Sequence, residues 1–367
     1  MIGMASTEKE GKAGKKVLIK GNDAIGEAAL RAGCRYYFGY PITPQSELLE
    51  YMAVNLPKRG GVFVQSESEL AGVSMVYGAA ATGVRAMTSS SSPGISLMQE
   101  CISYMASAEL PAVIVNISRG GPGLGRITPA QSDYFQATKG GGHGDYNLIV
   151  LTPASVQEMA ECTSLAFTLA DRYRTPAMIL GDAFVGQMME SIDPAALDPR
   201  EEAPEKPWAA RGAVGGVQNL VLSAPFTNEE LVAMNRRLQE KYRLIEERET
   251  RYEAYRTDDA EIVIVAFGIV SRFSKAAVDM LRREGWKVGL LRPITVFPFP
   301  AKAIRELAAR VRAFLDIEMN EGQMLQDVKL AVNGAVPVDF FGGGGGKYTT
   351  PQEIAAEVKR LYGGEGA

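Results

Sequence analysis

Two long parts of the chain alternate short apolar runs with stretches of helical periodicity. In residues 17–190, strand-like runs such as "KVLIKG", "GVFVQS" and "PAVIVNIS" alternate with amphipathic stretches such as "NDAIGEAALRAG" and "SVQEMAECTSLAFTLADRY". Residues 260–360 repeat the alternation with "EIVIVAFG", "SRFSKAAVDMLRREG" and "RAFLDIEM". Strands that alternate with helices predict α/β units, the first of them a mostly parallel, doubly wound sheet.

A polar segment separates these two parts. It opens with "DPAALDPREEAPEKPWAARGAVGG", whose proline, glycine and charge favour a linker or arm. "TNEELVAMNRRLQEKYRLIEERETRYEAY" follows; with Thr227 as N-cap and dense opposite charges it predicts a long, mostly solvated helix, or one with a coiled-coil partner. The predicted division is a disordered tail (1–16), a first α/β domain (17–190), a linker and charged helix (191–258) and a second α/β domain (259–362).

Polar and glycine-rich elements follow several of the predicted strands. They are "YPITP", "QSESE", "SSSSPG" and "SRGGPG". Ligands of open parallel sheets bind at the carboxyl ends of the strands, so these elements mark the expected site. "FGGGGGK" (341–347) lacks the Gly-Lys-Ser/Thr ending of a phosphate loop and is interpreted as a flexible or close-approach loop.

Glu67 and Glu69 precede a helix of small residues that has no charge before Arg85. Small residues permit close approach of another helix or a ligand. Burial of a carboxyl at the head of this helix would favour its protonated form, which could share a proton with a heterocyclic nitrogen. The alternative is that both carboxylates only stabilise the helix N-terminus.

Composition excludes several classes of protein. A net charge of −4 and a pI near 5.4 imply no broad basic face for nucleic acid. No apolar run is long enough for a membrane span, and the polar N-terminus is no signal peptide. Three scattered cysteines and one histidine exclude a four-cysteine iron–sulfur site or a histidine-rich metal centre within the chain. The cysteines are expected to be buried, in a reducing cytoplasm.

The segment that starts at Glu69 resembles the pyrimidine-binding domain of thiamine diphosphate enzymes. The shared pattern is a Glu, an Ala-Gly pair, a glycine at position 78, and "SSSSPG" after a strand. In that family the glutamate meets N1′ of the aminopyrimidine and promotes formation of the ylid. The resemblance assigns this role to Glu69, whose spacing to the pair and to Gly78 fits, and leaves Glu67 as its neighbour.

Further motifs narrow the resemblance. "GYPITPQSEL", "VNISRGGPGLG", "SDYFQATKGGGHGDYNLIVLTP" and "IEMNEGQM" together resemble the alpha subunit of 2-oxoacid:ferredoxin oxidoreductases, closest to the branched-chain, 2-ketoisovalerate type. The resemblance covers roughly residues 17–355. It implies that residues 259–362 form a transketolase C-terminal-like domain.

The resemblance also assigns residues to the site. Arg119 would bind the substrate carboxylate through its planar guanidinium, and Thr43 would lie near the substrate. The alternatives are a surface arginine and a turn hydroxyl. His143 could equally be a hydrogen-bonded loop histidine. The expected cofactor-binding residues are Pro41, Ile42, Ser90, Ser91, Ser92, Pro93 and Gly94, and Thr128 and His143 would border the pocket.

The motifs account for only one half of the cofactor site. The Gly-Asp-Gly pattern and downstream asparagine that bind Mg²⁺ and the diphosphate have no match, since "LGDAFVG" reads as a strand end. The resemblance therefore implies a beta subunit that carries this half, and no metal site here. The iron–sulfur clusters would lie on partner subunits, and gamma and ferredoxin-like subunits are expected among these. Ferredoxin would accept the electrons, and the assembly would be a dimer of heteromers.

The expected reaction is oxidative decarboxylation of a 2-oxoacid to acyl-coenzyme A and CO₂, with electrons passed to ferredoxin. Branched-chain 2-oxoacids are the first expected substrates, and 2-oxoglutarate is the second. Two alternatives remain: the pyrimidine-binding subunit of a non-oxidative thiamine decarboxylase, and a non-catalytic scaffold subunit.

Overall fold

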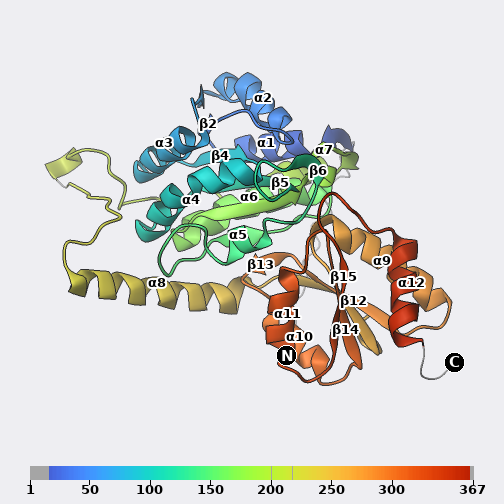
Figure 1. The fold of residues 1–367 in the computed structure, drawn as a ribbon. Coiled ribbons are helices and arrows are strands. Elements are labelled where there is room, and N and C mark those ends of the chain that lie inside the picture. Colours follow the sequence, from blue (N-terminus) through green and yellow to red (C-terminus); the bar gives the residue numbers. More distant parts are fainter. Residues whose placement is uncertain (1–15, 200, 217, 364–367) are drawn as a thin grey trace.

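The computed structural model describes residues 16–199, 201–216 and 218–363. The predicted tail, apart from Lys16, lies outside these residues. The chain forms two α/β lobes, the first blue to green and the second orange to red in Figure 1. No helix within the described residues is both long and apolar enough to cross a membrane.

The first lobe is built on a parallel sheet with strand order β7-β8-β5-β4-β2-β3, extended by β13 beside β7. Its parallel strands are β2 (Tyr36–Gly39), β3 (Val62–Gln65), β4 (Ala86–Ser90), β5 (Val113–Gly120), β7 (Ile149–Leu151) and β8 (Ala177–Asp182). β6 (Arg126–Pro129) and β13 (Thr295–Phe297) pair antiparallel with β5 and β7. β4, β5, β7 and β8 are buried along their whole length, as is typical of parallel strands in a sheet covered by helices on both faces.

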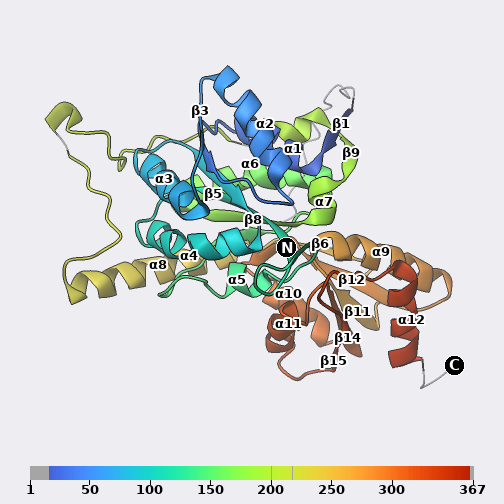
Figure 2. The same cartoon turned by 45° about the horizontal axis from the view of Figure 1, so that its top comes forward.

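Helices cover this sheet in two groups, α1 with α2 and α6, and α3 with α4 (Figure 2). They are α1 (Gly21–Arg31), α2 (Ser46–Asn55), α3 (Glu69–Ala81), α4 (Ser92–Ser107), α5 (Tyr134–Thr138), α6 (Val156–Tyr173) and α7 (Ala183–Gln187), with the 3₁₀ turn η1 (Pro57–Arg59). β1 (Val17–Lys20) pairs antiparallel with β9 (Met189–Ile192) in a separate ribbon, and the 3₁₀ turn η2 (Pro194–Leu197) follows. The doubly wound fold predicted from the alternation is confirmed, whereas β6, β9, α5 and α7 were not expected.

The second lobe has strand order β10-β12-β11-β14-β15. β11 (Ile262–Val265), β12 (Val288–Pro293), β14 (Ala313–Glu318) and β15 (Val338–Gly342) run parallel, and β10 (Tyr252–Tyr255) is an antiparallel edge. The helices are α9 (Gly268–Arg283), α10 (Ala301–Ala308), α11 (Met324–Val332) and α12 (Pro351–Tyr362).

The long charged helix is α8 (Asn228–Glu249), which begins at a capping box between Thr227 and Glu230. The prediction that this helix continues to Tyr255 was wrong, because Tyr252–Tyr255 pairs with β12 as strand β10. The two tyrosines among these four residues favour a strand over another turn of helix. The helix is mostly solvated as predicted, with four buried residues: Leu238, Tyr242, Ile245 and Glu249.

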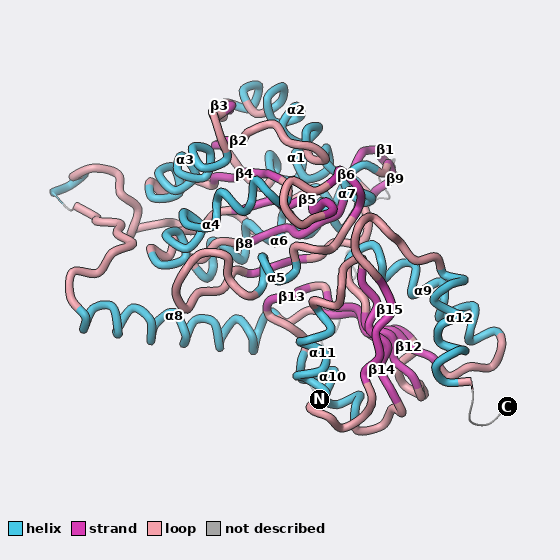
Figure 3. Tube along the Cα trace, viewed as in Figure 1, coloured by secondary structure: helices cyan, strands magenta, loops and turns pink. Residues whose placement is uncertain are grey.

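The segment between η2 and α8 projects from the first lobe as a long loop, at the left of Figures 1 and 3. We call its described residues within 199–227 the arm; they include the 3₁₀ turn η3 (Val214–Gly216). Lys206 fixes the base of the arm, where its Nζ lies 2.5 Å from an Asp171 oxygen of α6. Arg85 pairs with the other oxygen at 2.8 Å, and all three side chains are buried.

Candidate functional site

The polar loops predicted to form the site meet at one edge of the first sheet. Parallel register places Ser90 of β4 beside Asn116 of β5, and Gly39 of β2 beside Gln65 of β3. The carboxyl ends of these strands therefore lie side by side. The turn after β2, the head of α3 and the loops after β4 and β5 all leave from this edge.

Glu69 is the first residue of α3 and is buried. Ser68 caps the helix by accepting a hydrogen bond from the Ala71 N–H at 3.2 Å, so Glu69 is not needed as the cap. Within the described residues its carboxylate accepts a single hydrogen bond, a long one from Ser90 Oγ at 3.5 Å. Most of its hydrogen-bonding capacity is therefore available to a ligand. Glu67, two residues earlier, is exposed.

Gly94 makes room for this carboxylate. A Cβ at position 94 would lie 2.5 Å from Glu69 Oε1 and 2.0 Å from Ser90 Oγ. Both distances are shorter than any Cβ contact, so a side chain here would displace one of these groups. The glycine of the "SSSSPG" motif thus allows the head of α4 to pack directly against the buried acid.

Ser92 is held by two side chains that the sequence interpretation did not select. Asn116 Oδ1 accepts from the Ser92 N–H at 3.1 Å, and Asp133 Oδ2 accepts from Ser92 Oγ at 2.6 Å and from Asn116 Nδ2 at 2.9 Å. Burial raises the pKa of Asp133, while the hydrogen bonds from Ser92 and Asn116 oppose that shift. The asparagine inside the apolar run "VIVNIS" was the signal that could have revealed this network.

Arg119 joins two loops at the same edge. Its Nη1 donates to the Thr43 carbonyl at 3.0 Å and its Nη2 donates to the Leu124 carbonyl at 2.8 Å. Its backbone N–H donates to Ser92 Oγ at 3.0 Å, which links it to the loop beside Glu69. Nε is buried with no partner among the described residues. The guanidinium therefore keeps donors for a further acceptor.

The remaining predicted residues divide between this cluster and other places. Thr43 and Pro41 are exposed on the turn that Arg119 contacts, with Ile42 half-buried between them. Ser91, between β4 and α4, and Ser92, the first residue of α4, are both buried, and Ser91 Oγ has no partner in the described part of the chain. Pro93 is half-buried beside them.

Thr128 and His143 contact other parts of the chain. Thr128 packs against Gly120 and against Gly346 of the second lobe, where a Cβ at position 346 would lie 2.8 Å from its Oγ1. The loop "FGGGGGK" is thus a close-approach loop, as expected. His143 is exposed against Tyr104, ten residues beyond Gly94 on α4, which is about 15 Å along a helix.

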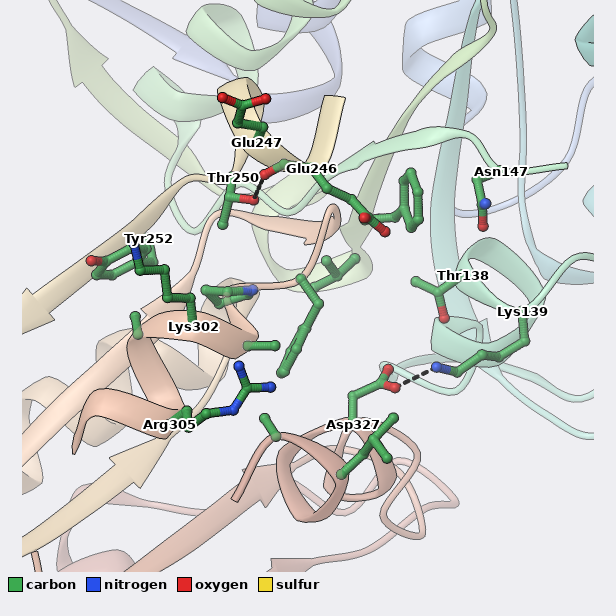
Figure 4. A pocket seen from close by; sticks show the side chains of 18 of the residues that line it. Thr138, Lys139, Asn147, Glu246, Glu247, Thr250, Tyr252, Lys302, Arg305 and Asp327 are labelled. Atoms are coloured by element: carbon green, nitrogen blue, oxygen red, sulfur yellow. Dashed lines mark hydrogen bonds and ion pairs between the residues drawn. The ribbon is translucent and has the colours of Figure 1, made fainter. Parts of the chain in front are cut away.

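A groove of about 1070 Å³ lies away from this cluster (Figure 4). It runs between the C-terminal end of α8 and helices α10 and α11 of the second lobe. Carboxylates and cations alternate along it: Glu246, Glu247 and Asp327 with Lys139, Lys302 and Arg305. None of the predicted site residues lines it. Among the described residues, no group of three or more His, Cys, Asp or Glu is placed to hold a metal ion.

Comparison with known families and relatives gives a consistent result. Residues 27–256 match the family described as pyruvate flavodoxin/ferredoxin oxidoreductase, thiamine diphosphate-binding, and residues 260–354 match pyruvate:ferredoxin oxidoreductase core domain II. The ketoisovalerate oxidoreductase subunit VorB of Methanothermobacter marburgensis is 51% identical over 94% of this chain and 98% of its own. The 2-oxoglutarate synthase subunit KorA of Methanothermobacter thermautotrophicus is 39% identical over 95% of this chain and 99% of its own.

Two solved structures are similar in fold. The 2-oxoglutarate:ferredoxin oxidoreductase from Magnetococcus marinus, with 2-oxoglutarate, coenzyme A and succinyl-CoA bound, superposes with a TM-score of 0.83 at 28% identity. The match covers 94% of this chain and 65% of that one. A split-gene transketolase matches with a TM-score of 0.60 at 14% identity, over 93% of this chain and 97% of its own, which shows a shared fold alone.

Proposed function

Because this chain belongs to the family of thiamine diphosphate-binding pyruvate flavodoxin/ferredoxin oxidoreductases, we propose that it is the alpha subunit of a 2-oxoacid:ferredoxin oxidoreductase. The complex converts a 2-oxoacid and coenzyme A to acyl-coenzyme A and CO₂ and passes electrons to ferredoxin. The observation that carries this proposal is the buried carboxylate of Glu69, which among the described residues accepts only a long hydrogen bond from Ser90 Oγ.

The residues at this edge fit the pyrimidine half of thiamine diphosphate. Bound there, the cofactor supplies the nucleophilic carbon that takes the acyl group of a 2-oxoacid as CO₂ leaves. Glu69 provides the carboxyl that holds or gives up a proton at the pyrimidine nitrogen, and Gly94, which has no side chain, lets this carboxyl pack against the head of α4. The buried, unpartnered Ser91 hydroxyl lies in the same loop.

Arg119 and Thr43 are the proposed substrate-binding residues. A guanidinium binds a carboxylate through two parallel hydrogen bonds, and Arg119 retains an unpartnered Nε. Because Arg119 also holds the carbonyls of Thr43 and Leu124, substrate binding is coupled to the position of both loops. Branched-chain acids are the leading substrates, on the similarity to the VorB subunit. 2-Oxoglutarate is next, on the similarity to the KorA subunit.

The outward face of α3 and α4 supports a partner subunit at this site. Leu70, Met75 and Leu97 are exposed there, and a Cβ at Gly78 would meet no atom within 4 Å. Glu69 heads this uncharged helix, so the subunit that brings the diphosphate half must approach the same face. We assign this face to the beta subunit with its Mg²⁺ site.

Iron–sulfur clusters, gamma and ferredoxin-like subunits, and a dimer of heteromers complete the proposed assembly. The proposed location is the cytoplasm, which agrees with the burial of all three cysteines.

The test is a Glu69→Gln variant in the complex purified with its partner subunits. The amide keeps the shape of the side chain but removes the acid, so turnover should fall at least about 100-fold, within the range typical of general acid–base groups. Coenzyme A-dependent reduction of a low-potential dye measures it across a panel of 2-oxoacids. Glu67→Gln makes the same change two residues away on an exposed side chain and should keep most of the activity.

Each other outcome selects a different function. CO₂ release without dye reduction in the unmodified complex would identify a non-oxidative decarboxylase. Full turnover by the Glu69→Gln complex would make this chain a scaffold. Unchanged kinetics in an Arg119→Ala complex would remove the substrate assignment.

A further inference from the structure

Two large aliphatic side chains lie next to Arg119 and point into solvent. Leu124 is 80% exposed and Ile127 is 63% exposed, although most leucines and isoleucines of this chain are buried. The carbonyl of Leu124 accepts a hydrogen bond from Arg119 Nη2 at 2.8 Å. The backbone of Leu124 is therefore held against the guanidinium, while its side chain stays exposed.

The geometry of β5 and β6 places Ile127 on the same side as Arg119. β5 and β6 pair Arg119 with Pro129 and Gly120 with Arg126, with a bulge between the two pairs that leaves Ile127 and Thr128 without a paired partner. Residues directly paired across strands share a face, and so do residues two apart on one strand. Arg126 shares the face of its partner Gly120, and a Cβ at Gly120 would lie 2.7 Å from Thr128 Oγ1, which puts Thr128 on that side too. Ile127 adjoins Thr128 in the extended strand and is therefore directed to the opposite side, that of Arg119.

Glycines make the turn before Ile127 tight. Gly123 and Gly125 adopt left-handed backbone angles, with φ of 69° and 62°. A Cβ at position 125 would lie 1.8 Å from the Gly120 carbonyl oxygen. The turn therefore closes directly on β5, and Leu124, between the two glycines, lies at its exposed tip.

We propose that Leu124 and Ile127 form the wall that receives the side chain of the 2-oxoacid and so select an uncharged aliphatic acid over a dicarboxylate. This inference rests on the proposed function. Once Arg119 holds the carboxylate, the substrate side chain extends from the adjacent keto carbon toward the aliphatic pair. A second carboxylate placed there would lose water without gaining a cation, because Arg126 faces the other way.

The experiment compares kcat/KM for 2-ketoisovalerate and 2-oxoglutarate in the complex with its partner subunits. Leu124→Arg and Ile127→Arg each place a cation on the wall, and the ratio in favour of 2-ketoisovalerate should fall at least about tenfold. Leu124→Ala removes aliphatic contact without adding charge and should lower kcat/KM for 2-ketoisovalerate about 10-fold or more. Arg126→Ala, on the opposite face of the same loop, should leave the ratio within about twofold.

The outcomes separate this inference from the proposed function. If the unmodified complex prefers 2-ketoisovalerate and all three wall variants keep the same ratio and the same kcat/KM, the wall assignment is overturned while the function stands. If only Arg126→Ala changes the ratio of the two kcat/KM values, the selectivity lies on the opposite face of the loop, and the wall assignment is also overturned. If the unmodified complex oxidises no 2-oxoacid, the proposed function falls and this inference falls with it.

Discussion

Single buried polar residues determine the geometry of the ligand-binding edge. Asn116 and Asp133 fix the loop that carries Ser92, and Ser92 in turn contacts the backbone of Arg119. A buried polar group without a partner costs free energy, so each of these groups restricts the positions of the others. Asp182 has a similar place at the end of β8, where its Oδ1 accepts the N–H groups of Phe184 and Val185 at 2.8 and 3.2 Å.

Asp182 should make stability depend on pH. Burial raises its pKa from the usual 3.8 to about 6, against the opposing effect of the backbone hydrogen bonds. Between about pH 4 and pH 6 the folded chain holds this proton and the unfolded chain does not. The contribution of Asp182 to stability therefore decreases as pH rises through this window, by about 3 kcal/mol for a shift of about two units.

An Asp182→Asn variant provides the measurement. The amide keeps Oδ1 as the cap of α7 but does not titrate, so the wild type should lose stability relative to the variant as pH rises from 4 to 7. Urea unfolding at several pH values gives the difference, which cancels other groups such as Asp133. Parallel stability profiles for the two proteins would contradict the assignment of this pKa.

At the scale of elements, a buried charge cluster attaches the arm to the first lobe. Asp171 of α6 lies between Arg85 at the start of β4 and Lys206 of the arm. Burial lowers the pKa of Lys206, while the charge of Asp171 opposes this shift. The Ala210 N–H of the arm also donates to the Ala81 carbonyl at the end of α3. The arm is thus attached where the proposed partner-binding helix ends.

Removing different members of this cluster should have unequal costs. Asp171→Ala leaves two buried cations without a carboxylate and should lower the free energy of unfolding by about 3–5 kcal/mol. Lys206→Met keeps the Arg85–Asp171 pair and the aliphatic packing, so its cost should be much smaller. Urea unfolding of both variants measures this order, and equal losses would show that the charges do not decide it.

At the scale of the whole molecule, the two lobes exchange edge strands. β10 precedes the second lobe in sequence but joins its sheet, whereas β13 comes from within the second lobe and pairs with β7 of the first. Gln131 adds two hydrogen bonds between the lobes. Its Nε2 donates to the Phe267 carbonyl at 2.8 Å, and its Oε1 accepts from the Met319 N–H at 3.1 Å. The sheet of each lobe is therefore completed by a strand from outside that lobe's own segment of the chain.

Separation of the lobes should expose strand edges. A fragment of residues 17–258 lacks β13, which leaves β7 unpaired, and it carries β10 without its partner β12. Unpaired edges promote aggregation, so this fragment should be recovered mainly in aggregates. Size-exclusion chromatography of the fragment, alone and co-expressed with residues 259–362, measures this. A monomeric, folded fragment 17–258 would show that the exchanged strands are dispensable.

The sequence by itself determined the local structure and the chemistry of single residues. Apolar runs specified the buried strands, Thr227 and its glutamate specified the start of α8, and the uncharged helix after Glu69 indicated a close-packed surface. These features depend on neighbours in the chain, which a pattern records directly. The motifs also identified the family.

Only the tertiary structure decided which distant groups meet. It paired β13 with β7, joined Asn116 to Asp133, placed the carbonyls of Thr43 and Leu124 on Arg119, and left His143 far from Glu69. Short strands and single polar side chains carry little local signal, because their partners are selected by burial and by the need to satisfy hydrogen bonds across the fold. Those long-range contacts fix the positions of the residues at the proposed site.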